Sequence, residues 1–258
     1  MMLFQAKITC LEPFDQRSAD VKTSSAKEQI NARNKMQLNF FLPRFKLYDF
    51  ADRNNADITR MIFRVANVPY EEVLIDRDGE WQQLQREMPL GTLPVLEIDG
   101  HKIGGTTAIC RQLAWRFGLS GETAADDSIV DMLADFLHEA HISLKSWINA
   151  IHNVNNSEQD VESLDKMANH YVNTRLGPVL EKHLEKNGTG FLVGGKMTWA
   201  DLMAISFFNT LFDNGREDFI SAFPLIKQHY QQIAPIVLPL KKFNDELKEG
   251  ALPIALSA

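Results

Sequence analysis

The sequence has little cysteine: Cys10 and Cys110 are the only two in 258 residues, and no CxxC pair occurs. This excludes a disulfide framework and a cysteine-rich zinc module, and it favours the reducing cytoplasm as location. Long apolar runs are lacking too, since no stretch approaches the roughly 18 residues that span a bilayer, so we expect no membrane partner. With a net charge of -7 the chain lacks the basic excess of a nucleic-acid binder, so no nucleic acid is expected either.

The composition that is present, 45% apolar and 24% charged, is that of a globular protein. Its length allows one large domain or two small ones. Residues 1–45 differ from the rest, because they carry seven Lys/Arg against four Asp/Glu and show no sustained hydrophobic period. Their first apolar residues, Met1–Phe4, are too few for a secretory signal. We therefore expect residues 1–45 to form a disordered extension, with Phe40–Pro43 pinning its end to the folded body.

The most informative stretch is Met88–Gly100. Within it, Val95–Ile98 alternates as a strand does, and Asp99–Gly100 is a strong hairpin-turn signal. Pro94 cannot donate a ladder hydrogen bond and is expected at the strand start. The backbone N–H and C=O of Leu93 would then lack partners beside the sheet edge. They suit a peptide-like ligand that binds as an extra strand, although an ordinary loop-to-strand entry explains the same pattern.

The folded part divides into two halves of different pattern. In the first, strands are predicted at 45–50, 70–75, 95–98 and 101–103, with helices after residue 55 and over 106–117. This order resembles the thioredoxin arrangement. A Gly/Ser/Thr linker over 118–125 precedes a helical half, and Thr198–Asp201 is predicted to be a capping box. Helices are predicted there at 124–151, 158–186, 202–212, 224–233 and 235–248.

Taken together, these features resemble the cytosolic glutathione transferases, and within them the sigma class with its nematode-type enzymes and prostaglandin D synthase relatives. The resemblance covers about Phe45 to Asn244, and it rests on Met88–Gly100, Ala108–Ala114, Gly190–Gly194 and Thr198–Leu202. It implies an α/β thioredoxin-like domain at 46–118, an all-α domain at 124–250 and a homodimer. The implied function is the conjugation or isomerisation of small hydrophobic electrophiles with glutathione as co-substrate and no further cofactor.

The resemblance also implies where glutathione binds. Pro94 would be a cis-proline, the Leu93 backbone would pair with the cysteinyl part of the tripeptide, and Asp131 would reach the ligand of the neighbouring subunit. The implied glutathione-binding residues are Trp81, Thr92, Leu93, Pro94, Gly105, Thr106 and Asp131. The chain departs from the family pattern at several ligand positions, namely Asn55, Asp57, Gln85, Thr92 and the pair Gly105–Thr106.

The largest departure concerns the thiol-activating tyrosine of the family, because Asp49 occupies the aligned position. A tyrosine hydroxyl that donates to the sulfur lowers the pKa of the thiol, whereas an ionised carboxylate nearby raises it. Tyr48 is the candidate catalytic residue that remains, but neighbouring strand residues point to opposite faces, so it would need a bulge or register slip. Two functions stay open: a transferase of weak activity, and a catalytically impaired structural or ligand-binding relative like the lens crystallins of this lineage.

Four further patterns have competing interpretations. The first is a set of carboxylates and imidazoles on one predicted helix face, which suggests either a metal or a plain polar face; ligands on one straight helix rarely close a shell, so no metal is expected. These residues are Asp131, Asp135, His138 and His141. Cys110 is interpreted as buried packing rather than a nucleophile. Trp81 is either a loop anchor or a ligand contact. In the implied homodimer, a helix edge of Val130, Ala134 and Leu137 is predicted to line the two-fold interface.

Overall fold

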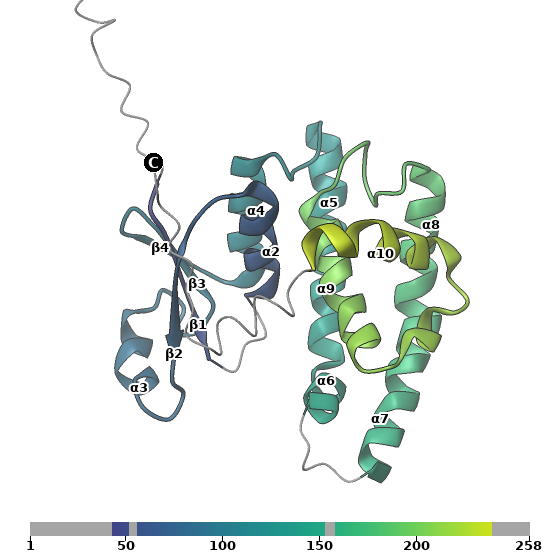
Figure 1. Ribbon diagram of the computed structural model, residues 1–258, viewed down its shortest axis with the longest axis horizontal. Helices are drawn as coiled ribbons and strands as arrows, with labels where there is room; N and C mark the ends of the chain where they lie inside the picture. Colours follow the sequence, from purple (N-terminus) through teal and green to yellow (C-terminus); the bar gives the residue numbers. More distant parts are fainter. Residues whose placement is uncertain (1–42, 52–55, 153–157, 239–258) are drawn as a thin grey trace, which may run out of the picture. The chain divides into compact units, whose positions relative to one another are not determined.

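The structure, a computed structural model, describes residues 43–51, 56–152 and 158–238 (Figure 1). The predicted disordered extension falls mainly on residues 1–42, outside the described residues, as do Asn55 and the end of the predicted helix 235–248. No described helix is long and apolar enough to cross a bilayer.

The described part of the chain contains a four-stranded sheet of order β2-β1-β3-β4. Its strands are β1 (Phe45–Phe50), β2 (Glu71–Ile75), β3 (Val95–Ile98) and β4 (His101–Gly104). β1 pairs with β2 in parallel and with β3 antiparallel, and β3 pairs antiparallel with β4. Asp99 and Gly100 join β3 to β4 with positive φ angles of 49° and 88°, as a two-residue hairpin turn requires. The predicted hairpin is confirmed.

Alternation along β1 gives the sheet one face that is covered by long helices. Phe45 and Leu47 are buried on this face, which packs under α2 (Asp57–Ala66) and α4 (Thr106–Phe117). The short helix α3 (Trp81–Leu84) and its 3₁₀ extension η1 (Gln85–Glu87) lie on the other side of the sheet (Figure 1). The α/β thioredoxin-like arrangement predicted from the sequence is therefore confirmed, and with it the glutathione transferase fold class.

The second half is helical, as predicted, but its helices are divided differently. It contains α5 (Ala124–Ser143), α6 (Lys145–His152), α7 (Glu158–Tyr171), the π-helix η2 (Val172–Leu176), α8 (Gly177–Asn187), α9 (Trp199–Asp213), η3 (Glu217–Ile220) and α10 (Pro224–Val237). The helix predicted over 124–151 is interrupted at Leu144, and the one over 158–186 contains the π-helical turn. The helices predicted at 224–233 and 235–248 form one helix through Pro235.

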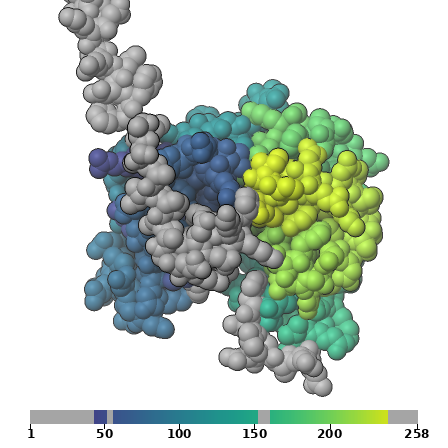
Figure 2. Space-filling view, in the orientation of Figure 1, coloured from purple at the N-terminus to yellow at the C-terminus, as the bar shows by residue number. Residues whose placement is uncertain are grey.

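Burial explains why α10 continues past a proline that removes one helix hydrogen bond. Ile233, Ala234 and Val237 all pack in the main core, so the apolar face holds both sides of Pro235 together. In α9 the predicted capping box is confirmed, because the side chains of Thr198 and Asp201 each accept from the other's backbone N–H. α2 also contacts α9 and α10, and Figure 2 shows the yellow surface of α10 adjoining the blue surface of the first half.

The interface edge predicted on α5 is wrong. Val130, Ala134 and Leu137 are fully buried within this chain, where α5 packs on α9, so they cannot meet a second subunit. The exposed apolar side chains of α5 include Ile129 and Met132, which are 37% and 52% exposed. Helical periodicity identifies apolar positions on α5, but it does not show that Val130, Ala134 and Leu137 face the core of this chain rather than a second subunit.

Candidate functional site

The candidate site begins where the chain enters β3. The Leu93–Pro94 peptide bond is cis, as the family resemblance implied. The ladder starts at Val95, and neither the N–H nor the C=O of Leu93 has a hydrogen-bond partner in the described part of the chain. The Leu93 side chain, in contrast, is buried with Met88 and Val95 in a small core. Leu93 is thus fixed by its side chain while its backbone groups remain able to bind.

The N-terminus of α4 forms the second part of the site. Gly105 is the N-cap residue, with φ 92°, and as a glycine it has no side chain that could cap the helix. Thr106 is the first helical residue. A twelve-residue helix that starts this way favours a carboxylate at its N-terminus.

Leu90 brings these two parts together. Although 65% of Leu90 is exposed, its side chain lies over Gly104, where an added Cβ would be 3.2 Å from the leucine Cγ. The loop that carries Leu93 therefore contacts the junction between β4 and α4. Thr92 and Pro94 lie on this loop, so the structure brings Thr92, Leu93, Pro94, Gly105 and Thr106 into one region.

Trp81 borders the same small core. Its ring packs edge-on against Phe50, with 5.1 Å between ring centroids. Gln85 donates from its side-chain amide to the carbonyl oxygen of Gly91 at 3.0 Å. This hydrogen bond is not predictable from the sequence, because the two residues lie in a short 3₁₀ segment and a turn without periodicity.

Tyr48 and Asp49 lie on opposite faces of β1, as the alternation predicted. Pairing is regular from Phe45 through Tyr48 against β3 and through Phe50 against β2, so the strand has no bulge there. Tyr48 lies on the face of the small core, whereas Asp49 is buried on the face of α2. The register slip that would bring Tyr48 to the position of Asp49 is absent from this strand.

Asp49 belongs to a buried cluster around Arg60 of α2. The guanidinium group contacts Asp49 at 3.0 Å, Glu72 at 2.6 Å and Asp57 at 2.6 Å. Burial raises the pKa of Asp49 despite the nearby arginine. Burial acts against the charged guanidinium as well, but the three carboxylates outweigh it and raise the pKa of Arg60. Arg60 is a functional residue that the sequence pattern does not single out, although it is a charged residue among the buried apolar residues Ile58, Met61 and Ile62 of α2.

The hydroxyl of Tyr48 is engaged elsewhere. It donates to a carboxylate oxygen of Glu97 at 2.9 Å, and the ammonium group of Lys102 lies 5.3 Å from the tyrosine ring centroid. Burial, followed by the hydrogen bond and charge of Glu97, raises the pKa of Tyr48 to about 12. At neutral pH the phenol therefore stays protonated and donates its hydrogen to Glu97.

Asp131 lies apart from this region, on α5. Both of its carboxylate oxygens accept from Nε of Arg111 at 2.9 Å. His141, from the same candidate metal face, packs edge-on against Phe207, and burial lowers its pKa. Among the described residues no group of three His, Cys, Asp or Glu could hold a metal ion. Cys110 is fully buried, and burial raises the pKa of its thiol to about 12, so it is not a nucleophile.

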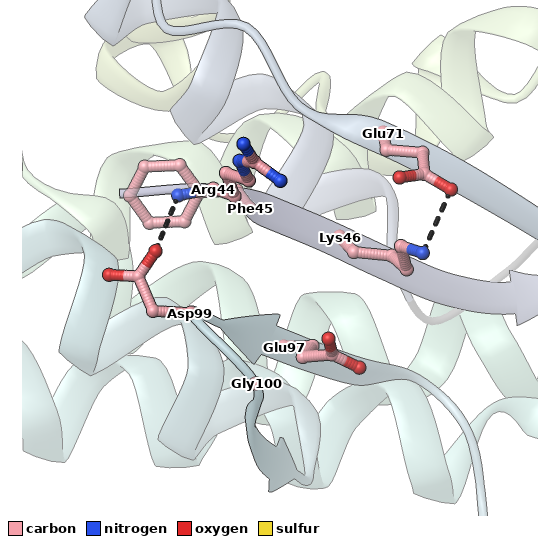
Figure 3. A pocket seen from close by; sticks show the side chains of 7 residues that line it. All are labelled: Arg44, Phe45, Lys46, Glu71, Glu97, Asp99 and Gly100. Carbon is pink, nitrogen blue, oxygen red and sulfur yellow. Dashed lines mark hydrogen bonds and ion pairs between the residues drawn. The ribbon is translucent and has the colours of Figure 1, made fainter. Parts of the chain in front are cut away.

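A separate hollow of about 470 Å³ lies at the other end of the sheet, where β1 begins and the β3–β4 turn follows (Figure 3). Across it, Lys46 pairs with Glu71, and Asp99 accepts from the backbone N–H of Arg44. Lys46 of β1 is in register with Glu71 of β2 and with Glu97 of β3, so side chains of opposite charge lie next to each other on adjacent strands. None of the predicted glutathione-binding residues lines this hollow, whose charged groups support the sheet.

Comparison with known proteins places the chain in a family. Residues 47–122 match the model described as "Glutathione S-transferase, N-terminal domain", and residues 143–236 match "Glutathione S-transferase, C-terminal domain". A probable glutathione S-transferase, gst-36 of Caenorhabditis elegans, is 34% identical over 195 residues, which are 72% of this chain and 88% of that protein. S-crystallin SL11 of Nototodarus sloanii is 36% identical over 167 residues, 63% of this chain and 77% of that protein.

A solved structure gives the same result. Monomeric Na-GST-3, a glutathione S-transferase from the hookworm Necator americanus, aligns with a TM-score of 0.69 at 29% identity. The alignment covers 78% of this chain and 96% of that one. Both domain models, the relatives and the fold agree along the described residues. The chain therefore belongs to the glutathione S-transferase family.

Proposed function

We propose that this chain binds glutathione on the Leu93 backbone and the N-terminus of α4, and that it conjugates small hydrophobic electrophiles with glutathione, or isomerises them, at a low rate. The observation that carries the proposal is the backbone of Leu93, which has no hydrogen-bond partner among the described residues, beside a helix that starts after the glycine N-cap Gly105. A peptide can pair with the first as an added strand, and its carboxylate can bind the second. Trp81, Thr92, Pro94, Gly105 and Thr106 complete the proposed site.

The low rate follows from the groups available to the sulfur. A free thiol has a pKa near 8.5 and is mostly protonated at neutral pH. A hydroxyl donor would stabilise the thiolate, but we infer that Asp49 stands where the family places that donor. Asp49 is paired with Arg60, and the Tyr48 hydroxyl is bound to Glu97 on the opposite face. Neither side chain is therefore positioned to donate a hydrogen bond to the sulfur of a glutathione bound at the Leu93 backbone.

A second function has a specific observation in its favour. The identity to an S-crystallin, 36% over 167 residues, is comparable to the 34% over 195 residues to a named transferase, and a chain with weak thiol activation fits a structural or ligand-binding role. The two functions differ in one measurable respect. A weak transferase binds glutathione and turns over a reactive electrophile, whereas a purely structural relative does neither.

We further propose a homodimer through the exposed apolar side chains of α4 and α5. Trp115 is 75% exposed on α4, and Ile129 and Met132 are exposed on α5. Large exposed apolar side chains on neighbouring elements favour association. Family membership alone does not set the assembly, since the hookworm relative is described as monomeric. We infer that Asp131, on the same helix, reaches the ligand of the partner subunit in this dimer.

Calorimetric titration with glutathione tests the binding site. We expect binding to the wild type, and an affinity about tenfold lower for Thr106→Val, since a hydrogen bond to a charged group contributes roughly 1.5–3 kcal/mol. Thr107→Val, the next residue of the same helix, is the matched control and should bind as the wild type does. Absence of heat with the wild type, or equal affinities of the two variants, would count against the proposed site.

A further inference from the structure

We propose that Gln85 is a positioning residue for this site: its side-chain amide holds Gly91 and thereby fixes the loop that presents the Leu93 backbone. The ligand in this proposal rests on the proposed function, while the fixed loop is a property of the protein alone. Gln85 itself would not touch the tripeptide. Its amide is committed to the Gly91 carbonyl oxygen at 3.0 Å.

Three hydrogen bonds form a closed ring around the start of the loop. The N–H of Met88 donates to the Gln85 carbonyl oxygen at 3.3 Å, and the N–H of Gly91 donates to the Met88 carbonyl oxygen at 3.0 Å. The Gln85 amide returns to Gly91 and completes the ring. Only the last of these bonds comes from a side chain, so one substitution opens the ring without altering the backbone.

The loop needs this bond because it has little other polar support. Met88 and Leu93 anchor its two ends by burial in the small core, but Pro89 and Leu90 between them are exposed. Gly91 adopts a left-handed φ of 61°. A glycine backbone can readily change to other conformations, because glycine has no Cβ. The Gln85 amide fixes the peptide after Gly91, two residues before Leu93. If Gly91 changed its conformation, the N–H and C=O of Leu93, which are proposed to bind the ligand, would therefore move as well.

The consequence for catalysis is specific. A more mobile loop populates conformations that do not bind glutathione, so the apparent affinity falls in proportion to the population of the binding conformation. Once the tripeptide is bound, the loop is ordered and the sulfur has the same surroundings as before. Loss of the Gln85 amide should therefore raise KM for glutathione and leave kcat unchanged.

Hydrogen exchange of the ligand-free protein tests directly whether the Gln85 amide fixes the loop at Gly91. In Gln85→Leu we expect the amide of Gly91 to exchange about three- to tenfold faster, the range given by one hydrogen bond. Gln85→Glu, which keeps the size but offers only acceptors, should do the same. Gln82→Leu, an exposed glutamine of α3 with no such bond, is the matched control and should leave the rate unchanged. An unchanged rate in both Gln85 variants would overturn the proposal.

A second measurement separates positioning from direct contact. KM is compared for glutathione and for its glycine ethyl ester, which lacks the terminal carboxylate. If Gln85 acts through the loop, Gln85→Leu raises both KM values by the same factor; a change confined to free glutathione would mean that Gln85 binds the carboxylate, which would overturn the proposal. If the wild type binds neither compound, the proposed function fails, while the exchange rates still decide whether Gln85 fixes the loop.

Discussion

At the scale of single residues, Arg60 connects the fold with the site. It holds Asp49 at the end of β1 and Glu72 on β2 while it belongs to α2. The second carboxylate oxygen of Glu72 is buried without a hydrogen-bond partner among the residues described. Among the described residues this cluster contains three carboxylates and one guanidinium, so it is sensitive to the loss of that guanidinium.

Replacing Arg60 with methionine should therefore be costly, because the buried carboxylates of Asp49 and Glu72 would lose their cation. We expect the free energy of unfolding to fall by about 3 kcal/mol, as is typical when one partner of a buried ion pair is removed. Urea unfolding at neutral pH measures it. Arg64→Met, at an exposed position of the same helix, should cost less than about 0.5 kcal/mol. Similar losses in the two variants would contradict the role of the cluster.

The protonation of Asp49 gives a pH dependence with a definite sign. Its folded-state pKa is raised above 3.8, so its contribution to stability is full below that value and is lost as the pH rises through the folded pKa. Asparagine resembles the protonated carboxyl group at every pH. The stability of the wild type relative to Asp49→Asn should thus decrease as the pH rises from about 4 towards neutral. Thermal melts across this range that show an increase would refute it.

The sequence predicts part of this residue-scale picture. Alternation along β1 is enough to place Tyr48 and Asp49 on opposite faces, because side-chain period is a local property. The partners of these residues are not predictable in the same way. Arg60 and Glu97 are distant in sequence from the residues they bind, and only the packing of α2 on the sheet and the register of β3 brings them together.

At the scale of elements, the chain uses the same capping motif in two environments. At α5, Thr123 and Asp126 form an exposed capping box. At α9, Asp201 is fully buried and accepts from Thr198, from the N–H of Leu192 and at 2.9 Å from His229 of α10. The sequence predicts the second box but not its connections to the preceding loop and to α10.

This difference predicts unequal costs for one substitution. Asp201→Ala leaves several buried donors without a partner, and we expect it to lower the free energy of unfolding by about 3 kcal/mol or more. Asp126→Ala removes a cap that water can replace, and should cost about 1 kcal/mol. Urea unfolding of both variants is the measurement. Equal costs would mean that the buried connections of Asp201 contribute little.

Element boundaries were predicted less well than elements. The breaks at Leu144 and at the π-helix Val172–Leu176 leave the apolar period of each helix nearly unchanged, so periodicity does not detect them. At Pro235 the sequence predicts a break between two helices, but the structure has one continuous helix, because burial on both sides of the proline outweighs its local helix-breaking tendency. The α5 edge shows the same limit, since an apolar period does not say which partner will cover it.

At the scale of the whole molecule, the proposed dimer makes a prediction about solution mass. Sedimentation at micromolar concentration should give a dimer for the wild type and a monomer for Met132→Glu, because a charge would be buried against the partner. Ile236→Glu changes an apolar side chain of α10 that is 60% exposed, and it should leave the dimer intact. A monomeric wild type, or loss of the dimer in both variants, would exclude this interface.

The central claim is that this chain keeps the glutathione platform of its family without the group that activates the thiol. The most direct test is a pH titration of the bound thiol, followed by thiolate absorbance in the ultraviolet with the protein saturated by glutathione. We predict a pKa at or above the ordinary value of about 8.5. A bound thiol that titrates at about 7 or below would contradict the claim, and loss of that shift in Tyr48→Phe would assign the activation to Tyr48.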